Sequence, residues 1–314
     1  MATDIKPKTA EGYDPIITRA CESALLTLLG AFTTLGDTVR LVGGLAPRYL
    51  TPENAPGVPA HAGTSDVDIV LDLAVIAEGE GYADLATQLN AGGFRRHINE
   101  RGNTVAWRWE ITIQGIPIMV EFLRDAQGRK PSTTIPIDGE NVSALAIKHA
   151  GIAHDWFIDH KVTGELGDGA IVTRTIHVAD VPAFVILKAL SLQSRYENKD
   201  AADLIHVLRY AGSVEEIAQM FVQKLLSGAH PEAMKDGLEA LADGFRHPER
   251  RELSYKVQGP FRYAQFHYGS GESEAKMEAQ RFAAGLVGKL LDEIKAQERA
   301  ARKAAARGSL KTPG

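Results

Sequence analysis

Apolar residues recur at two different spacings along this chain, and the spacing predicts which segments are helices and which are strands. In residues 17–36 they recur at helical intervals, and Gly36 is a typical helix stop. Further helices are predicted within 79–94 and 143–156. Short runs rich in β-branched and aromatic residues predict strands at 38–42, 65–72, 95–98, 104–111, 116–123, 157–166 and 170–179. The pattern therefore predicts an α+β domain over 1–180, a mixed sheet with flanking helices.

The remainder of the chain, 181–314, has helical spacing almost throughout. Helices are predicted within 181–210 (two), 214–228, 231–245 and 273–307. The segment 246–273 lacks a regular pattern and is expected to be an irregular connector. We therefore expect an α-helical domain over 181–314 that follows the α+β domain.

One stretch, residues 41–72, combines two features that suit phosphate and metal binding. Gly43 and Gly44 follow a buried strand and precede a segment that can start a helix, and the free backbone amides of such a turn suit a phosphate. Asp66 and Asp68 alternate with apolar residues, so the two-residue period of a strand places both carboxylates on one face. Together they predict a site for Mg²⁺ and a nucleoside triphosphate. Either motif alone also fits an ordinary turn or a solvated strand face.

A third carboxylate, Glu121, interrupts the apolar run of 116–123. A buried carboxylate needs a partner. A metal ion shared with Asp66 and Asp68 would supply one, and so would a salt bridge to an arginine. The candidate arginines are Arg95, Arg96 and Arg124.

The two helices predicted within 181–210 carry a further group of charges. Lys188 and Arg195 are seven residues apart and share a helical face, whereas Asp200 and Asp203 share the first turn of the next helix. The helix dipole favours acids in a first turn, which is a purely structural explanation for both.

The composition is that of an ordinary globular protein and narrows the possible partners and compartment. The chain has 314 residues, of which 44% are hydrophobic and 24% charged, and a net charge of −5. Any nucleic-acid contact must therefore come from a local basic patch, such as the arginines of 246–273, Arg262 among them, or the basic end of the last helix. A single cysteine, Cys21, excludes an intrachain disulfide and indicates a reducing compartment. Without a secretion signal or a membrane-length apolar window, the chain is expected to be cytoplasmic, with no membrane partner.

The order of these motifs resembles a known family. A buried strand, Gly43-Gly44 and then Asp66-x-Asp68 is similar to the signature of the DNA polymerase β-like nucleotidyltransferase superfamily, with an inserted loop at 51–63. The charges of 188–204 closely resemble the second characteristic block of AbiEii-type nucleotidyltransferases. These are the toxin components of bacterial abortive-infection and toxin–antitoxin systems, including the MenT-like enzymes.

The resemblance implies a role for each position. Asp66, Asp68, Lys188 and Asp200 would be catalytic, with Asp203 competing for the last assignment. The implied metal ligands, for Mg²⁺ or Mn²⁺, are Asp66, Asp68 and Glu121. The implied nucleotide contacts are Gly43, Gly44, Ser65, Lys188 and Arg195.

The function that this resemblance implies is transfer of a nucleoside monophosphate from an NTP to an acceptor, with release of pyrophosphate. The expected acceptor is the 3′ end of a tRNA, and a cognate antitoxin protein is an expected partner. Two alternatives remain open at this stage. The chain could nucleotidylate a protein or small molecule, or it could be a non-catalytic nucleotide-binding module of the same fold.

Overall fold

A computed structural model describes residues 6–32, 36–52, 55–71, 84–137 and 141–309 of the chain. The chain divides into two compact units, one formed by 1–49 with 59–184 and the other by 50–58 with 185–314. Of the predicted inserted loop, 51–63, residues 51–58 therefore belong to the second unit and 59–63 to the first. The chain passes from the first unit to the second within one helix, α6 (Val181–Ser194).

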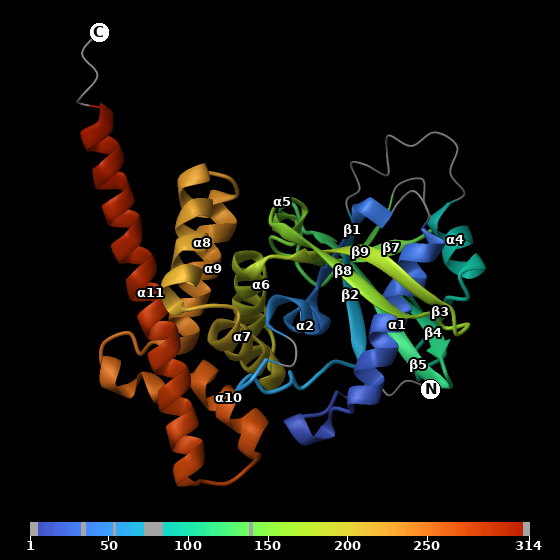
Figure 1. Cartoon of the computed structure of the whole chain (residues 1–314). Helices are drawn as coiled ribbons and strands as arrows, with labels where there is room; N and C mark the ends of the chain where they lie inside the picture. Colours follow the sequence, from blue (N-terminus) through green and yellow to red (C-terminus); the bar gives the residue numbers. More distant parts are fainter. Residues whose placement is uncertain (1–5, 33–35, 53–54, 72–83, 138–140, 310–314) are drawn as a thin grey trace. The chain divides into compact units, whose positions relative to one another are not determined.

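The first unit is built on one mixed sheet, labelled in Figure 1. Its main path runs in the order β3, β4, β5, β2, β1, β9 and β8, while β7 pairs with β5 and β6 with β7. The strands are β1 Val39–Val42, β2 Asp66–Leu71, β3 Arg95–Ile98, β4 Thr104–Ile113, β5 Ile116–Asp125, β6 Thr134–Pro136, β7 Ser143–Ile147, β8 Phe157–Glu165 and β9 Ile171–Ala179. The predicted α+β class with a mixed sheet and flanking helices is confirmed.

Parallel and antiparallel pairs meet at β2. This strand pairs antiparallel with β1 and parallel with β5. Its apolar residues Val67 and Ile69 are fully buried. They point to the face of the sheet opposite Asp66 and Asp68, as the sequence predicted. A one-residue slip would bring the polar side chains of β2 into the core, so the register is strongly specified.

Helix α1 (Pro15–Ala31) packs against the sheet and contacts β2, β4, β5 and β8 (Figure 1). It begins where the sequence provides a cap, since the Asp14 carboxylate accepts a hydrogen bond from the Ile16 amide and Pro15 is the first helical residue. Leu25, Leu28 and Cys21 on this helix are buried. The other short elements are η1 Ala10–Gly12, η2 Gly36–Thr38, η3 Gly43–Leu45, α2 Pro47–Leu50, α4 Leu85–Ala91 and α5 Ile152–Asp155. Of the helix predicted within 79–94, residues 79–83 lie outside the described part.

The prediction of a helix over 143–156 was wrong. Residues 143–147 form β7, which is parallel to β5, and only Ile152–Asp155 are helical. Ala144 and Ala146 are fully buried and alternate with half-buried neighbours, the period of a strand. Alanine favours helices in isolation, but burial against β5 overrides this weak preference.

The second unit is helical. Its elements are the rest of α6 together with α7 Asn198–Tyr210, α8 Val214–Ser227, α9 Pro231–Phe245, η4 Arg251–Lys256, α10 Gln258–Tyr268 and α11 Glu274–Ser309. The long helix α11 contacts α7, α8, α9, α10 and η4. The buried side chains Leu204, Phe221, Leu241, Phe266 and Leu290 contribute one core residue from each of α7 to α11.

The segment 246–273, predicted to be irregular, contains a complete helix, α10. Its first turn holds Gly259 and Pro260, which the sequence pattern treats as helix breakers. Proline is tolerated in a first turn because the amide it lacks has no intrahelical partner there. Among the described residues, no helix combines the length and apolar content that crossing a bilayer requires.

Candidate active site

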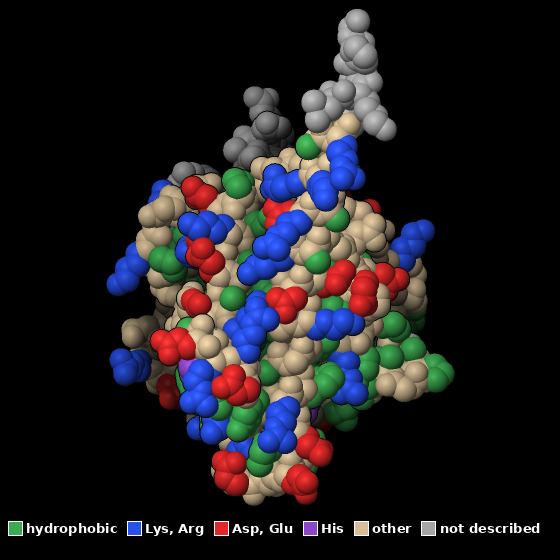
Figure 2. Space-filling model, turned by 90° about the vertical axis from the view of Figure 1, so that its left-hand side faces the viewer, with side chains coloured by type: hydrophobic (Ala, Val, Ile, Leu, Met, Phe, Trp, Pro, Cys, Tyr) green, Lys and Arg blue, Asp and Glu red, His purple; other side chains and the backbone are tan. Residues whose placement is uncertain are grey.

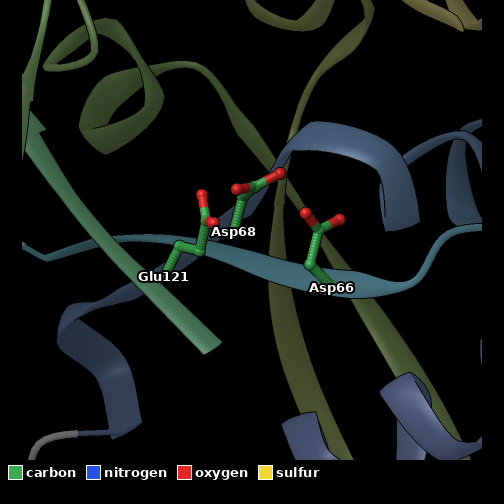
Figure 3. Close-up of side chains that lie close together, drawn as sticks. All are labelled: Asp66, Asp68 and Glu121. Atoms are coloured by element: carbon green, nitrogen blue, oxygen red, sulfur yellow. The ribbon is translucent and has the colours of Figure 1, made fainter. Parts of the chain in front are cut away.

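Three carboxylates from two neighbouring strands lie together in the first unit. Asp66 and Asp68 are on β2 and Glu121 is on β5. Because the two strands are parallel and Asp68 lies opposite Glu121 in the register, their side chains leave the sheet side by side. Figure 3 shows all three side chains pointing to the same side of their strands.

The carboxylates are close enough to share one ion. One oxygen from each lies within 4.8 Å of the others. Asp66 and Glu121 are buried, whereas Asp68 is half-buried and gives the cluster its contact with the surface. Among the described residues, these three form the one group of at least three side chains placed closely enough to hold a metal ion together.

Gly43 lies directly against this cluster. It follows Val42, which pairs with Asp68 across β1 and β2, and its φ is +69°. A Cβ atom at this position would lie 1.8 Å from Asp68 Oδ2. Only glycine therefore allows the backbone to approach the carboxylate this closely. Gly44 is buried in the same turn, η3, which leads to a single helical turn, α2, and so the predicted helix is short.

Two threonines that the sequence did not single out position Asp66. The Thr64 hydroxyl donates to Asp66 Oδ1 over 2.9 Å. The backbone of Thr64 is in turn held by α1, since its amide donates to Thr18 Oγ1 over 3.1 Å. Ser65, the predicted phosphate contact, is half-buried in the bend just before β2. Thr64, and not Ser65, therefore orients the first carboxylate.

A cation from the start of the chain reaches the same cluster. Lys6 forms an ion pair with Asp66 Oδ2, and about a third of its side chain is exposed. Burial alone would lower the pKa of Lys6, but the charges of Asp66, Asp68 and Glu121 outweigh it and raise that pKa. The ammonium group thus stands in the place of a bound cation.

Glu121 has the most unusual environment of the three. Burial, together with the charges of Asp68 and Asp66, raises its pKa to about 8, although Lys6 and Arg108 act in the opposite direction. Arg108 on β4 is its salt-bridge partner, with 2.9 Å between Nε and Oε1. The salt bridge considered from the sequence therefore exists, but with Arg108 and not with Arg95, Arg96 or Arg124.

The donor set fits a hard divalent cation. Oxygen ligands from carboxylates are those that Mg²⁺ and Mn²⁺ prefer. The raised pKa values of Glu121 and Lys6 both report excess negative charge, which a divalent cation would neutralise. Asp66, Asp68 and Glu121 are the residues that would hold it.

The charged residues predicted on α6 and α7 form a separate cluster within the second unit. The Lys188 ammonium donates to Asp200 Oδ1 over 2.9 Å and to Asp203 Oδ2 over 2.8 Å. Lys199 binds Asp203 over 2.7 Å, and Arg195 donates through Nε to Asp200 Oδ2 over 2.8 Å. Burial would raise the pKa of Asp200, but Lys188 and Arg195 outweigh it and lower that pKa to about 2. Three cations and two carboxylates thus join α6 to α7.

Burial separates the members of this cluster. Lys188, Asp200 and Asp203 are 6%, 1% and 0% exposed, so their charges point into the unit. The side chain of Arg195 is about half exposed. Arg262, expected at a surface, is also buried: it donates to the carbonyls of Leu192 and Arg195 and so satisfies the end of α6.

Two histidines of the sheet, His160 and His177, have ordinary structural contacts. His177 pairs with Asp159, and the ring of His160 packs against Tyr49.

No protein-family model matches the chain, and no curated protein sequence is significantly similar to it.

Proposed function

We propose that this protein is a metal-dependent nucleotidyltransferase with a polymerase β-like first domain. The observation that carries the proposal is the carboxylate cluster of Asp66, Asp68 and Glu121, which neighbouring strands hold within 4.8 Å beside the Gly43 turn. Clusters of like charge with shifted pKa values are costly to fold and are concentrated at functional sites.

The proposed reaction is an in-line displacement at the α-phosphorus of an NTP. The acceptor oxygen forms a bond to that phosphorus, the bond to the β-phosphate oxygen breaks, pyrophosphate leaves, and the hydroxyl proton passes to the medium. Divalent cations bound at the carboxylates would neutralise triphosphate oxygens and activate the acceptor hydroxyl.

The residues of this chain supply position and charge. Thr64 and Arg108 hold Asp66 and Glu121 in place through their hydrogen bond and ion pair. Positioning partners of this kind commonly matter for metal affinity almost as much as the ligands do. The missing side chain at Gly43 allows the backbone of the turn to lie directly against the Asp68 carboxylate. Lys6 must withdraw before a cation binds, because its ammonium group uses the same carboxylate.

The acceptor and the biological setting enter only through the resemblance to AbiEii-type enzymes. That resemblance makes the 3′ end of tRNA the first acceptor to test and a cognate antitoxin the first partner. It also assigns nucleotide contacts to Ser65, Lys188 and Arg195, and a catalytic role to Asp200 or Asp203. The ion pairs among Lys188, Arg195, Asp200 and Asp203 also give these four residues a structural role.

The decisive experiment uses purified protein, Mg²⁺, total tRNA and each α-labelled NTP in turn. We expect label in tRNA from one NTP, lost in Asp68→Asn and retained in Asp243→Asn, which neutralises an exposed carboxylate of α9. Label on protein or on a small molecule would redirect the acceptor. Absence of any Asp68-dependent label and of pyrophosphate release would refute the proposal and leave a non-catalytic module.

A further inference from the structure

The last helix of the second unit extends beyond the core that it packs on. Along α11 the last fully buried side chain is Ile294, which is 2% exposed. Gln297 still reaches α8 through a hydrogen bond to the Glu215 carbonyl. After it, every side chain from 298 to 307 is exposed or half-buried. This end of α11 therefore does not serve the packing of the unit.

The extended end is strongly basic. Within 295–307 it carries five cations and a single acid, Glu298, although the whole chain has a net charge of −5. At 100° per residue, all five cations fall within an arc of about 140° of the helix surface. They are Lys295, Arg299, Arg302, Lys303 and Arg307. Figure 2, which faces this helix, shows Lys and Arg side chains following one another along it.

The same face of α11 continues into a pocket of about 240 Å³ nearer the middle of the helix. Arg281, Gly285 and Gly288 line the pocket from α11, and by the same helical arithmetic they lie in the arc of the five cations. A Cβ atom on either glycine would meet nothing within 4 Å, so the floor of the pocket is open.

The opposite wall carries two arginines, Arg246 and Arg251, and the ring of Tyr255, together with Glu252 and Ser254. Arg246 and Arg251 both contact Asp292, at 2.8 Å and 3.3 Å, and the Arg281 guanidinium lies 5.3 Å from the ring centre of Tyr255. The side chain of Arg251 is 74% exposed, so its charge is available to solvent. Pocket and basic face form one surface, which we call the α11 basic face.

We propose that the α11 basic face docks the phosphodiester backbone of a nucleic acid. From Arg281 to Arg307 it is about 39 Å long, at 1.5 Å per helical residue, or roughly one turn of a duplex. Arginine-rich grooves with an aromatic side chain are typical of nucleic-acid surfaces. An anionic membrane fits poorly, because the opposite side of 295–307 offers alanines and no large apolar residue. This proposal concerns binding alone and does not depend on nucleotidyl transfer.

The test is binding of labelled 24-base-pair RNA and DNA duplexes to the full-length protein, by fluorescence anisotropy over a series of salt concentrations. The test variant combines Lys295→Gln, Arg299→Gln, Arg302→Gln and Lys303→Gln. We expect it to weaken binding at least tenfold and to reduce the slope of log Kd against log salt by about 3 to 4, one for each lost phosphate contact. Tighter binding of one duplex would identify RNA or DNA as the source of the backbone.

The matched control removes the same charge from exposed sites of the first unit: Arg101→Gln, Arg129→Gln, Lys130→Gln and Lys161→Gln. It should bind like the wild type. Both variants should melt within about 2 °C of wild type, since they change exposed side chains. Equal losses in the two variants, or no loss in the α11 variant, would overturn the proposal. Polyglutamate that competes as well as nucleic acid at equal charge would also overturn it, in favour of an acidic protein.

Discussion

Replacing Gly43 with alanine is the most direct test of the geometry of the carboxylate cluster. A Cβ atom at this position would lie 1.8 Å from Asp68 Oδ2 and 2.7 Å from Asp68 Cβ, where real contacts stay above 3.0 Å. The carboxylate oxygen would have to retreat by more than about 1 Å. Rotation of the side chain cannot relieve the contact with Asp68 Cβ, so β1 and β2 must also separate.

The expected magnitude can be worked out in two parts. Alanine at a φ of +69° costs about 1–2 kcal/mol relative to glycine. Forcing an extra carbon against β2 adds about 1–3 kcal/mol. Gly115, in the β4–β5 turn of the same sheet, provides the control, because its φ is +82° and nothing lies within 4 Å of its Cβ position. Gly115→Ala should therefore show only the first part.

Two measurements separate the parts. Urea unfolding should show Gly43→Ala destabilised by about 2–5 kcal/mol and Gly115→Ala by about 1–2 kcal/mol. Calorimetric titration with Mn²⁺ should show at least about tenfold weaker binding for Gly43→Ala and no change for Gly115→Ala. If both variants lost the same stability and bound Mn²⁺ like the wild type, the close approach of Gly43 to Asp68 would be refuted.

Four further predictions concern titration and the competing ammonium group of Lys6. Because the pKa of Glu121 is raised to about 8, we expect Glu121 to release a proton when a metal ion binds. The affinity for Mn²⁺ should therefore rise with pH up to about 8, and Glu121→Gln should lose this pH dependence. A wild-type affinity that does not change with pH would contradict this prediction. In the metal-free protein the stability due to the protonated Glu121 is present at low pH and lost as pH rises through about 8. Lys6→Met should tighten Mn²⁺ binding by up to about fivefold, the equivalent of about 1 kcal/mol, whereas Lys8→Met in the same segment should not. Because its pKa is lowered to about 2, the ionised Asp200 contributes about 2 kcal/mol to the free energy of unfolding above pH 4, and this contribution is lost as the pH falls through 2. In urea unfolding, Asp200→Asn should not show this loss of stability in acid.

The sequence identified the three carboxylates because the signal for each of them is local. Strand period alone places Asp66 and Asp68 on one face, and an acid within an apolar strand identifies Glu121. The pairing of Arg108 with Glu121 was also within reach. A two-residue turn at Gln114-Gly115 pairs Ile113 with Ile116, and counting back along the hairpin brings Arg108 opposite Glu121.

What the sequence could not supply is non-local. The parallel pairing of β2 with β5 brings Asp68 next to Glu121, although 53 residues separate them, and no turn dictates that register. The same holds for Lys6, which reaches Asp66 from the start of the chain. The helix predicted over 143–147 was wrong for a related reason, since these residues form a strand through their pairing with β5 and β6, which lie elsewhere in the sequence.

Charge balance distinguishes the two buried ionic clusters. On α6 and α7, Lys188, Lys199 and Arg195 more than match Asp200 and Asp203, and the cluster is complete from its own side chains. Replacing such a network by apolar residues is often tolerated, so it is weak evidence for function.

In the first unit the balance is different. Three carboxylates lie together with Arg108 and Lys6, and burial and the charges of Asp68 and Asp66 raise the pKa of Glu121 to about 8. An arrangement that holds three acids this close together and raises the pKa of one of them is short of positive charge. Folding gains nothing from that shortage, whereas a site built to bind a divalent cation requires it. The carboxylate cluster of β2 and β5, and not the larger ion network of the second unit, is therefore where we propose that a divalent cation binds.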